Sequence, residues 1–240
     1  MEWQDEGVLI AMRAHGESSA IIEVFTATHG RHAGVVRGGG SRKQAATLQP
    51  GTQLAVAWRA RLEDHIGSYT VEPLQSRAGL MDDRLALAGL TAICAMLRVA
   101  LPEREAHPTL WRATMHLLAA LEHDPDWPAL YLRWEMILLE ELGFGLDLSR
   151  CAVTGSRDGL AFVSPKTGRA VSRIGAGDWV DRLFPLPQCL MGQGPASPLE
   201  ITQGLAITGH FLSRELTEGL MGRPLPEART RLITLLGKLK

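Results

Sequence analysis

The chain has 240 residues, and its hydrophobic content of 45% is enough to bury the core of one or two domains. Its net charge of −1 excludes a polycation, and its three cysteines, Cys94, Cys151 and Cys189, are too few and too scattered for a disulfide framework or a four-thiolate metal site. The chain starts without the basic and apolar run of a signal peptide, and its longest apolar stretch, residues 85–97, is too short to span a bilayer. We therefore expect a cytoplasmic protein without a membrane segment.

Residues 1–80 are predicted to form a small β-barrel. Short runs rich in β-branched and aromatic residues are separated by turn residues such as Gly30, and in the fourth run Leu54, Val56 and Trp58 share one face, as in a half-exposed strand. The expected strands cover residues 8–13, 20–26, 32–37, 54–60 and 68–72. Five short antiparallel strands suit a closed barrel of the oligonucleotide/oligosaccharide-binding (OB) type, and an SH3-like barrel would give much the same pattern.

The hydrophobic period changes to that of helices near residue 82. Asp82 or Asp83 can cap a helix that ends before Pro102, and Ser197 with Glu200 supplies a capping box for a later helix. Further helices are expected over residues 109–122, 128–142 and 226–236. From residue 151 onward, glycines and prolines break the chain into short β-like pieces, which predicts a compact, turn-rich knob.

These elements predict an α+β protein with an N-terminal five-stranded OB-type barrel, followed by an α-helical domain with an inserted small turn-rich β knob. The predicted domains are the barrel (residues 1–80), a helical domain (81–150), the knob (151–195) and C-terminal helices packed on the helical domain (196–240). The sequence contains no internal repeat and no low-complexity linker.

The stretch from Arg31 to Arg61 creates a local positive field, because it holds six cations and no Asp or Glu. The six cations are Arg31, Arg37, Arg42, Lys43, Arg59 and Arg61. Three glycines at positions 38–40 allow close backbone approach, so that backbone N–H groups can face an anion beside the charged side chains. A polyphosphate is the partner that this pattern favours, although glycine-rich basic turns are also common in solvated hairpins.

Motifs of covalent chemistry are missing from the sequence. The triple glycine lacks the spacing and the Ser or Thr of a P-loop, and neither a Gly-x-Ser-x-Gly elbow nor a His-Glu-x-x-His pair occurs. His29 and His32 bracket a turn, but the sequence places no further metal ligand beside them. We therefore expect no metal, no cofactor and no enzymatic activity.

Two blocks of residues resemble a known family. The first block is Gly16-Glu17-Ser18-Ser19, Glu23-Val24-Phe25-Thr26, Gly30-Arg31, Val36-Arg37-Gly38-Gly39 and Leu48-Gln49-Pro50-Gly51. The second block is Leu138-Leu139, Leu142-Gly143-Phe144-Gly145-Leu146-Asp147-Leu148 and Cys151-Ala152-Val153-Thr154-Gly155. Together with the order of barrel, helices, knob and helices, which covers the whole chain, this set resembles the bacterial RecO family of recombination mediator and DNA repair proteins.

The resemblance implies a non-catalytic role in DNA repair and homologous recombination. It implies an OB-fold that binds single- and double-stranded DNA, anneals complementary strands and helps to load the RecA recombinase onto gaps covered by single-strand DNA-binding protein. The implied partners are RecR and the acidic, apolar C-terminal tail of the single-strand-binding protein. The alternatives are an RNA-binding or translation-associated OB-fold protein and a nucleic-acid hydrolase.

The knob departs from those relatives that hold zinc with two Cys-x-x-Cys pairs. Cys151 is followed three residues later by Thr154, and Ala170-Val171-Ser172-Arg173 stands where the second pair would fall. With one thiol of four left, we expect no zinc, a knob held by packing and hydrogen bonds, and a small buried Cys151.

The candidate DNA-binding residues are the six barrel cations together with a second cluster on the knob. The barrel cations would neutralise phosphates, so that affinity falls with salt and ignores sequence. The knob cluster, Lys166, Arg169 and Arg173, would let one molecule hold two strands for annealing, or is ordinary surface. Trp58 and Tyr69 would add base stacking if exposed, but Trp58 lies on the apolar face of its strand, which favours burial.

Recognition of an acidic, apolar tail needs an apolar groove with a cation at its rim. The candidates are Arg112 and Arg133, which stand beside Trp111 and Trp134 on the expected middle helices. Helical spacing equally explains both tryptophans as core residues.

Overall fold

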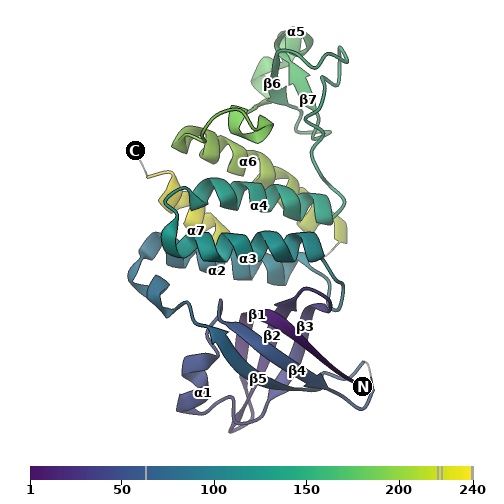
Figure 1. Cartoon of the computed structure of the whole chain (residues 1–240). Helices are drawn as coiled ribbons and strands as arrows, with labels where there is room; N and C mark the ends of the chain where they lie inside the picture. Colours follow the sequence, from purple (N-terminus) through teal and green to yellow (C-terminus); the bar gives the residue numbers. More distant parts are fainter. Residues whose placement is uncertain (63, 221, 223, 239–240) are drawn as a thin grey trace. The chain divides into compact units, whose positions relative to one another are not determined.

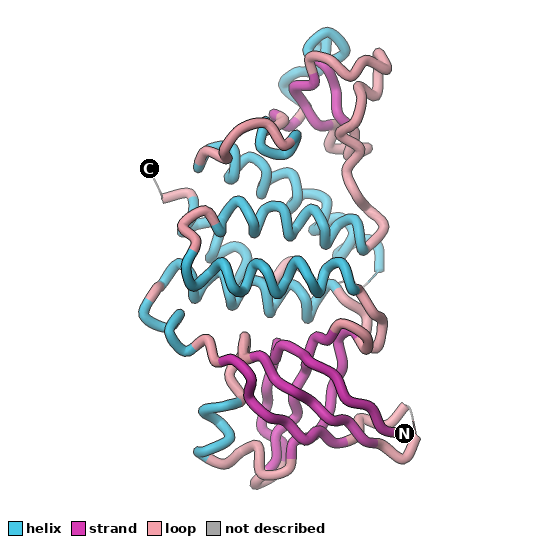
Figure 2. The backbone as a smooth tube through the Cα atoms, in the orientation of Figure 1, coloured by secondary structure: helices cyan, strands magenta, loops and turns pink. Residues whose placement is uncertain are grey.

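The computed structural model describes residues 1–62, 64–220, 222 and 224–238, and the side chains of residues 43, 45 and 218–220 lie outside this description. The chain divides into two compact units, Met1–His123 and Asp124–Lys240, each with buried apolar side chains of its own. Figure 2 shows the strands of the barrel in the first unit and the small sheet in the second. In the described part of the chain, no helix is both long and apolar enough to cross a membrane.

The first unit begins with a five-stranded barrel (Figure 1). Its strands are β1 (Glu2–His15), β2 (Ser19–Thr26), β3 (Gly30–Val36), β4 (Gln53–Arg59) and β5 (Ser68–Gln75). The order β1-β2-β3-β5-β4 closes on itself, because β1 pairs antiparallel with both β2 and β4 and a short parallel pairing joins β3 to β5. This arrangement is that of an OB-type barrel, and the predicted α+β fold class is confirmed.

Side chains that alternate along the strands fill the barrel. Leu54, Val56 and Trp58 of β4 are buried on its inner face, as their period predicts. Gly34 of β3 gives room to Tyr69, because a Cβ at position 34 would lie 2.4 Å from the tyrosine ring. Burial of a large apolar side chain stabilises a fold by about 1.5–3 kcal/mol, so this interior is the main source of the barrel's stability.

Two elements of the first unit differ from the predicted ones. Strand β1 starts at Glu2 rather than at residue 8, because only its alternate residues Trp3 and Asp5 are partly covered and the acidic residues between them hide the strand pattern. Helix α1 (Arg42–Thr47) has no predicted counterpart, since its six residues carry no apolar stripe. It is started by Ser41, whose Oγ accepts a hydrogen bond from the Gln44 N–H.

Helices complete the first unit. They are the 3₁₀ helix η1 (Ala78–Asp82) and the α-helices α2 (Arg84–Ala100) and α3 (Pro108–His123). Of the two predicted caps, Asp83 is the one that starts α2, because its carboxylate accepts hydrogen bonds from the N–H groups of Leu85 and Ala86. Helix α2 packs against both β1 and α3, which attaches the helices to the barrel within this unit.

The second unit combines long helices with a small sheet. Its elements are α4 (Trp127–Glu141), β6 (Leu160–Val163), β7 (Ala170–Ser172), α5 (Arg173–Ala176), η2 (Gly177–Arg182), β8 (Phe184–Pro185), η3 (Gln188–Met191), α6 (Pro198–Arg214), η4 (Glu215–Leu220) and α7 (Glu227–Leu236). Helix α6 packs on α4 and on α7. It starts with the predicted capping box, in which Ser197 and Glu200 bond each other's backbone N–H groups.

A buried ion pair joins the three helices of this unit that pack together. Arg229 of α7 donates to both carboxylate oxygens of Glu135 in α4, at 2.7 and 2.8 Å, and to the carbonyl of Leu205 in α6. Thr208 of α6 donates a further hydrogen bond to the same carboxylate. Gly209 makes room for the guanidinium, because a Cβ there would lie 2.6 Å from Arg229 Nη1. These contacts fix α4, α6 and α7 relative to one another.

The knob consists of the sheet β7-β6-β8 and the short helices beside it (Figure 1). Cys151 is buried in it, as predicted, and its Sγ accepts hydrogen bonds from the N–H and Oγ of Ser172 and from the Thr154 N–H, at 3.2 to 3.4 Å. Burial alone would raise the pKa of this thiol, but the hydrogen bonds outweigh it and lower the pKa to about 6. One sulfur therefore ties the turn after Cys151 to the strand β7.

Candidate nucleic-acid interface

Two of the predicted cations flank a hollow on the barrel. Arg37 directly follows β3 and Arg59 ends β4, and the pairing of both strands with β5 brings them to Ser68. The hollow has a volume of about 380 Å³, and its lining includes Gln44 of α1 and Tyr69 of β5. Both arginine residues are exposed. A hollow between two exposed guanidinium groups suits the phosphates of an extended nucleic-acid strand.

The glycine loop after β3 does not present its backbone N–H groups as the sequence predicts. Those of Gly39, Gly40 and Ser41 donate to carbonyl groups of the protein at 3.0 to 3.2 Å. They are therefore not available to an anion, and this part of the prediction is wrong. Gly38 adopts a φ of 71°, a left-handed conformation that glycine accepts without strain. Anion binding at this loop must come from the side chains that the loop positions.

Two further barrel cations are exposed close in sequence to this hollow. Arg42 lies on the first turn of α1, and Arg61 lies in the loop after β4. The side chain of Lys43, which belongs to the same predicted set, lies outside the described residues. The described exposed set on the barrel therefore consists of Arg37, Arg42, Arg59 and Arg61.

Arg31 is placed differently from this exposed set. Its Nη1 lies 2.7 Å from Glu23 and 3.4 Å from Glu103, and its Nε donates to the Leu101 carbonyl. The side chain is only 12% exposed. A guanidinium held by two carboxylates is already neutralised, so Arg31 joins the barrel to the segment after α2. We therefore leave it out of the proposed DNA-binding surface.

Arg59 also has a carboxylate partner, but an exposed one. Its Nη2 lies 3.0 Å from Glu2, and the two side chains are 73% and 54% exposed. Ion pairs this exposed contribute about 0–1 kcal/mol, because water and salt screen them. A phosphate can therefore replace Glu2 beside Arg59 at little cost.

The knob exposes part of its predicted basic cluster. Lys166 is exposed in the turn between β6 and β7, and Arg173 is exposed at the start of α5. Arg169 is half-buried, and its Nε lies 3.4 Å from Asp147. Hydrogen bonds from Ser149, with Arg169 beside them, hold the pKa of Asp147 below its ordinary value. Arg169 is thus engaged in the structure of the knob, whereas Lys166 and Arg173 face solvent.

Trp58 and Tyr69 are buried inside the barrel. The predicted burial of Trp58 is confirmed, and its Nε1 donates to the Ile66 carbonyl at 3.0 Å. Gly67 lies directly on this ring, since a Cβ there would be 2.5 Å from Trp58 Nε1. Neither aromatic side chain is available to stack on a base in the way that the stacking hypothesis requires.

Among the residues predicted to bind a protein tail, Arg133 borders a hollow in the second unit. Arg133 is exposed on α4, and the hollow has a volume of about 350 Å³ with Leu190 and Ile201 in its lining. Trp134, its neighbour in sequence, is buried and stacks on Tyr131 at a centroid distance of 5.7 Å. Trp134 is therefore a core residue.

Trp111 and Arg112 lie on α3, in the first unit. Trp111 is half-buried and packs edge-to-face on Phe25, with ring centroids 5.6 Å apart. Arg112 is exposed. The predicted tail-binding set is thus divided between the two compact units.

The sequence analysis missed a second hollow at one end of the barrel, which we call the aromatic hollow. It has a volume of about 400 Å³, and its lining includes the rings of Trp3, His29, His32 and Trp58 together with Arg104. The available signal was the alternation that begins at Trp3 and the two nearby histidines. Within the described part of the chain, no three His, Cys, Asp or Glu residues are grouped so that they could hold a metal ion.

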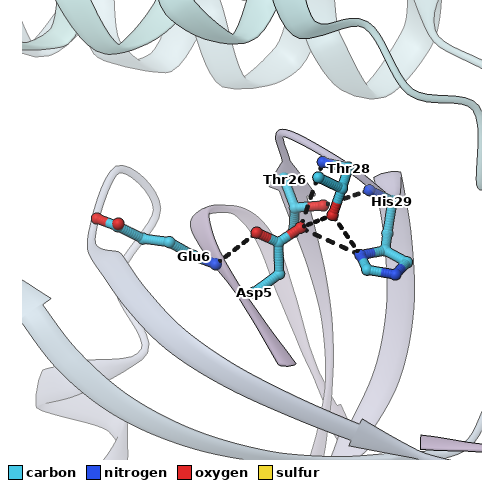
Figure 3. Close-up of polar contacts among 5 residues, drawn as sticks. All are labelled: Asp5, Glu6, Thr26, Thr28 and His29. Atoms are coloured by element: carbon cyan, nitrogen blue, oxygen red, sulfur yellow. Dashed lines mark hydrogen bonds and ion pairs between the residues drawn. The ribbon is translucent and has the colours of Figure 1, made fainter. Parts of the chain in front are cut away.

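A polar network fixes one ring of the aromatic hollow. The carboxylate of Asp5 accepts a hydrogen bond from Thr28 Oγ1 at 2.5 Å and lies 3.1 Å from His29 Nδ1 (Figure 3). The N–H of Glu6 donates to its other oxygen at 2.8 Å. Burial alone would raise the pKa of Asp5, but the hydrogen bonds from Thr28, His29 and Glu6 outweigh it and lower the pKa. Asp5 is therefore ionised at neutral pH and holds the His29 ring in one orientation.

His32 is neutral at physiological pH. Burial, with a smaller contribution from the charge of Arg104, lowers the pKa of His32 to about 4. Its Nδ1 lies 3.0 Å from the Ala33 carbonyl, which can only accept a hydrogen bond. The proton therefore sits on Nδ1, and Nε2 is left as an acceptor.

A five-stranded barrel of this strand order, with exposed cations at its strand ends, places the chain in the class of OB-fold proteins. Two family models match it in succession. The model described as Recombination protein O N terminal matches residues 1–77, and the model described as Recombination protein O C terminal matches residues 81–224. The chain therefore belongs to the RecO family.

Relatives of known name are similar over nearly the whole chain. The DNA repair protein RecO of a Cereibacter sphaeroides strain is 71% identical over 238 residues, which are 99% of both chains. The proteins of the same name are 60% identical over 97% of both chains in Roseobacter denitrificans, and 54% identical over 100% of both chains in Dinoroseobacter shibae. The resemblance found in the sequence is confirmed, and membership of this family supports a role in DNA repair and recombination.

Proposed function

We propose that this protein binds single- and double-stranded DNA without covalent chemistry and anneals complementary strands. The observation that carries the proposal is the hollow flanked by Arg37 and Arg59 on an OB-type barrel. Cations at such a surface neutralise phosphates and release counterions, which gives an affinity that is independent of sequence and falls with salt. Membership of the RecO family supports DNA as the partner.

Annealing requires one molecule to bring two like-charged strands together. The exposed barrel cations supply one surface for a strand, and Lys166 with Arg173 on the knob supplies a second. Positive side chains between the strands screen the repulsion of their phosphates, which is the barrier to annealing. This role does not change the covalent structure of either strand.

The proposed function includes protein partners in the cytoplasm. The protein acts with RecR and helps to load RecA onto DNA that is coated with single-strand-binding protein. Support for these partners comes from the family. The structure offers one surface that suits the tail of the single-strand-binding protein, namely the hollow beside Arg133.

Charge sets the direction of a bound tail in this hollow. The tail is acidic and apolar, and Leu190 and Ile201 provide apolar lining. Asp124 and Asp126 also line the hollow and repel a carboxylate. The acidic groups of the tail are therefore expected at Arg133, away from the two aspartates.

The DNA-binding surface is tested by removing its two flanking cations. In the double variant Arg37→Ala/Arg59→Ala, the affinity for a labelled single-stranded oligonucleotide should fall, and the slope of log affinity against log salt should become flatter by about 1–2, because each lost phosphate contact removes about 0.9. Fluorescence anisotropy at several salt concentrations measures both quantities.

A matched control removes two other exposed arginines. The variant Arg84→Ala/Arg150→Ala changes net charge by the same amount at positions away from the barrel strands. It should keep the wild-type slope. Equal slopes for both double variants would contradict the proposed surface.

The competing functions are tested with the same oligonucleotides. A nucleic-acid hydrolase would shorten the labelled strand in the presence of magnesium or manganese, whereas the proposed mediator leaves its length intact. An RNA-binding protein would prefer RNA of the same sequence in competition.

Tail binding is tested with a fluorescent peptide of the single-strand-binding protein's C-terminal sequence. Arg133→Ala should weaken binding about tenfold or more, because a charge-assisted contact is lost, and Arg112→Ala on α3 should leave it unchanged. The reverse result would move the tail to the first unit.

A further inference from the structure

We propose that the aromatic hollow binds one unstacked nucleobase of a single DNA strand. The inference rests on the proposed function, because the base would belong to a strand held by the barrel cations. The hollow is lined by Trp3, His29, His32, Trp58 and Arg104, among others. None of these residues belongs to the predicted DNA-binding set.

The rings of the hollow present a surface on which a base can stack. Trp58 and Trp3 are near-parallel, at 20° with centroids 5.7 Å apart, and Trp3 and His29 are stacked at 8° and 3.9 Å. His29 is 32% exposed, and among the described residues Trp3 is the ring stacked on it. A planar base placed on the other face of His29 continues this stack. Base stacking of this kind tolerates every base, since each has a π-face.

The platform is held rigid before any ligand arrives. His29 cannot rotate freely, because its Nδ1 contacts both Asp5 and Thr28 at 3.1 and 2.9 Å (Figure 3). The backbone N–H of His29 also donates to Thr26 Oγ1 at 3.0 Å. A fixed ring loses little conformational entropy when a ligand stacks on it.

Charge separates a nucleotide from the other ligand that aromatic boxes bind. Rings grouped in this way also hold organic cations. Here the guanidinium of Arg104 lines the hollow, and so does Met1, whose ammonium group donates to the Ala60 carbonyl at 2.8 Å. The carboxylate of Glu2, also in the lining, is already paired with Arg59. Two positive groups oppose a cationic ligand and favour an aromatic ligand attached to phosphate.

His32 adds a hydrogen-bond acceptor to this hollow. The neutral ring donates from Nδ1 to Ala33, which leaves Nε2 with a lone pair, and no donor among the described residues bonds to it. The exocyclic amino groups of adenine, cytosine and guanine are donors of the required kind. This acceptor suits a base and has no role in binding phosphate.

The hollow is continuous with the proposed backbone-binding surface. The pairing of β1 with β4 places Glu2 opposite Arg59 and Trp3 opposite Trp58. One step along these strands therefore leads from the flanking cation Arg59 to the aromatic hollow. A strand whose phosphates contact Arg59 can place a neighbouring base in the hollow.

The test compares two labelled single strands of equal length that differ only in their bases. One is oligo(dC), and the other carries abasic tetrahydrofuran residues in place of the nucleosides, so that its phosphates are retained. We expect the full-length protein to bind oligo(dC) about 5- to 100-fold more tightly, as one stacked base would give. His29→Ala should bring this ratio close to one without changing the affinity for the abasic strand.

Two further variants keep the test decisive. His29→Gln retains a donor for Asp5 but has no ring, so it should lose the preference for bases even if His29→Ala fails to fold. His15→Ala removes an exposed histidine at the other end of β1 and should keep the full preference.

Each result decides a separate claim. Failure to bind either strand would contradict the proposed function itself. Equal affinity for the two strands, or an unchanged preference in both His29 variants, would overturn the aromatic hollow as the base site while leaving the proposed function intact. Competition by oligo(rC) that is tenfold stronger than by oligo(dC) would overturn its assignment to DNA.

Discussion

The barrel interior contains a histidine whose protonation opposes folding. The folded state keeps His32 neutral down to a pKa of about 4, whereas a histidine in the unfolded chain has a pKa near 6.5. The unfolded state therefore binds more protons in this range, and stability is full above pH 6.5 and falls as the pH drops toward 4. We predict a loss of about 2 kcal/mol from this residue between pH 7 and pH 5. Asp5, whose pKa is lowered below the ordinary carboxyl range, adds its loss only at lower pH.

Urea unfolding followed by tryptophan fluorescence at pH 7 and pH 5 measures this loss. His32→Gln removes the titrating group, so its free energy of unfolding should change less between the two pH values than that of the wild type. His15→Gln, at an exposed position, should behave like the wild type. The same pH dependence in His32→Gln as in the wild type would show that another group is responsible.

The buried pair of Glu135 and Arg229 gives a second prediction at this scale. Arg229→Met leaves a buried carboxylate without its partner and should destabilise the second unit by about 3–5 kcal/mol. The double variant Glu135→Leu/Arg229→Met removes both charges, so it should be less destabilised than Arg229→Met alone. Denaturant unfolding of the three proteins checks this order. A double variant as unstable as the sum of two single losses would mean that the ion pair contributes no coupling.

At the scale of elements, the knob depends on one sulfur atom. Cys151→Ala removes the acceptor of hydrogen bonds from Ser172 and Thr154, and leaves two backbone N–H groups unpaired. We predict a local loss of about 1–3 kcal/mol for each buried unpaired donor. Hydrogen exchange should therefore speed up for the amides of β6 and β7, while the amides of the barrel exchange as before. Unchanged exchange in the knob would show that packing alone holds it.

Elements with strong periodic patterns were readable from the sequence, and local signals fixed their ends. Asp83 and the Ser197/Glu200 capping box are examples, because the bonds that they make lie within one helical turn. Helix α1 and the start of β1 were not readable, since neither has an apolar pattern of its own. These elements take their shape from the barrel against which they lie.

The candidate site was readable as a set of charges but not as an arrangement. Arg37 and Arg59 meet because β3 and β4 both pair with β5, and such long-range pairing is not encoded near either residue. Arg31 was assigned to DNA because no acid lies near it in the following sequence, but Glu23 and Glu103 reach it through the fold. The aromatic hollow has the same cause, since its rings come from β1, β3, β4 and the turn before β3.

At the scale of the whole molecule, the chain separates its tasks between two compact units. The first unit carries the exposed barrel cations and the aromatic hollow, both suited to a nucleic-acid strand. The second carries the knob cations and the hollow beside Arg133. A division of this kind allows DNA and a protein tail to be bound by the same molecule without competing for one surface.

The most direct measurement is the annealing of complementary strands that are coated with single-strand-binding protein. We predict that the wild-type protein accelerates annealing, that the effect weakens as salt rises, and that Arg37→Ala/Arg59→Ala loses most of it while Arg84→Ala/Arg150→Ala retains it. A wild-type protein that leaves the annealing rate unchanged, or an Arg37/Arg59 variant that is as active as the wild type, would contradict the account.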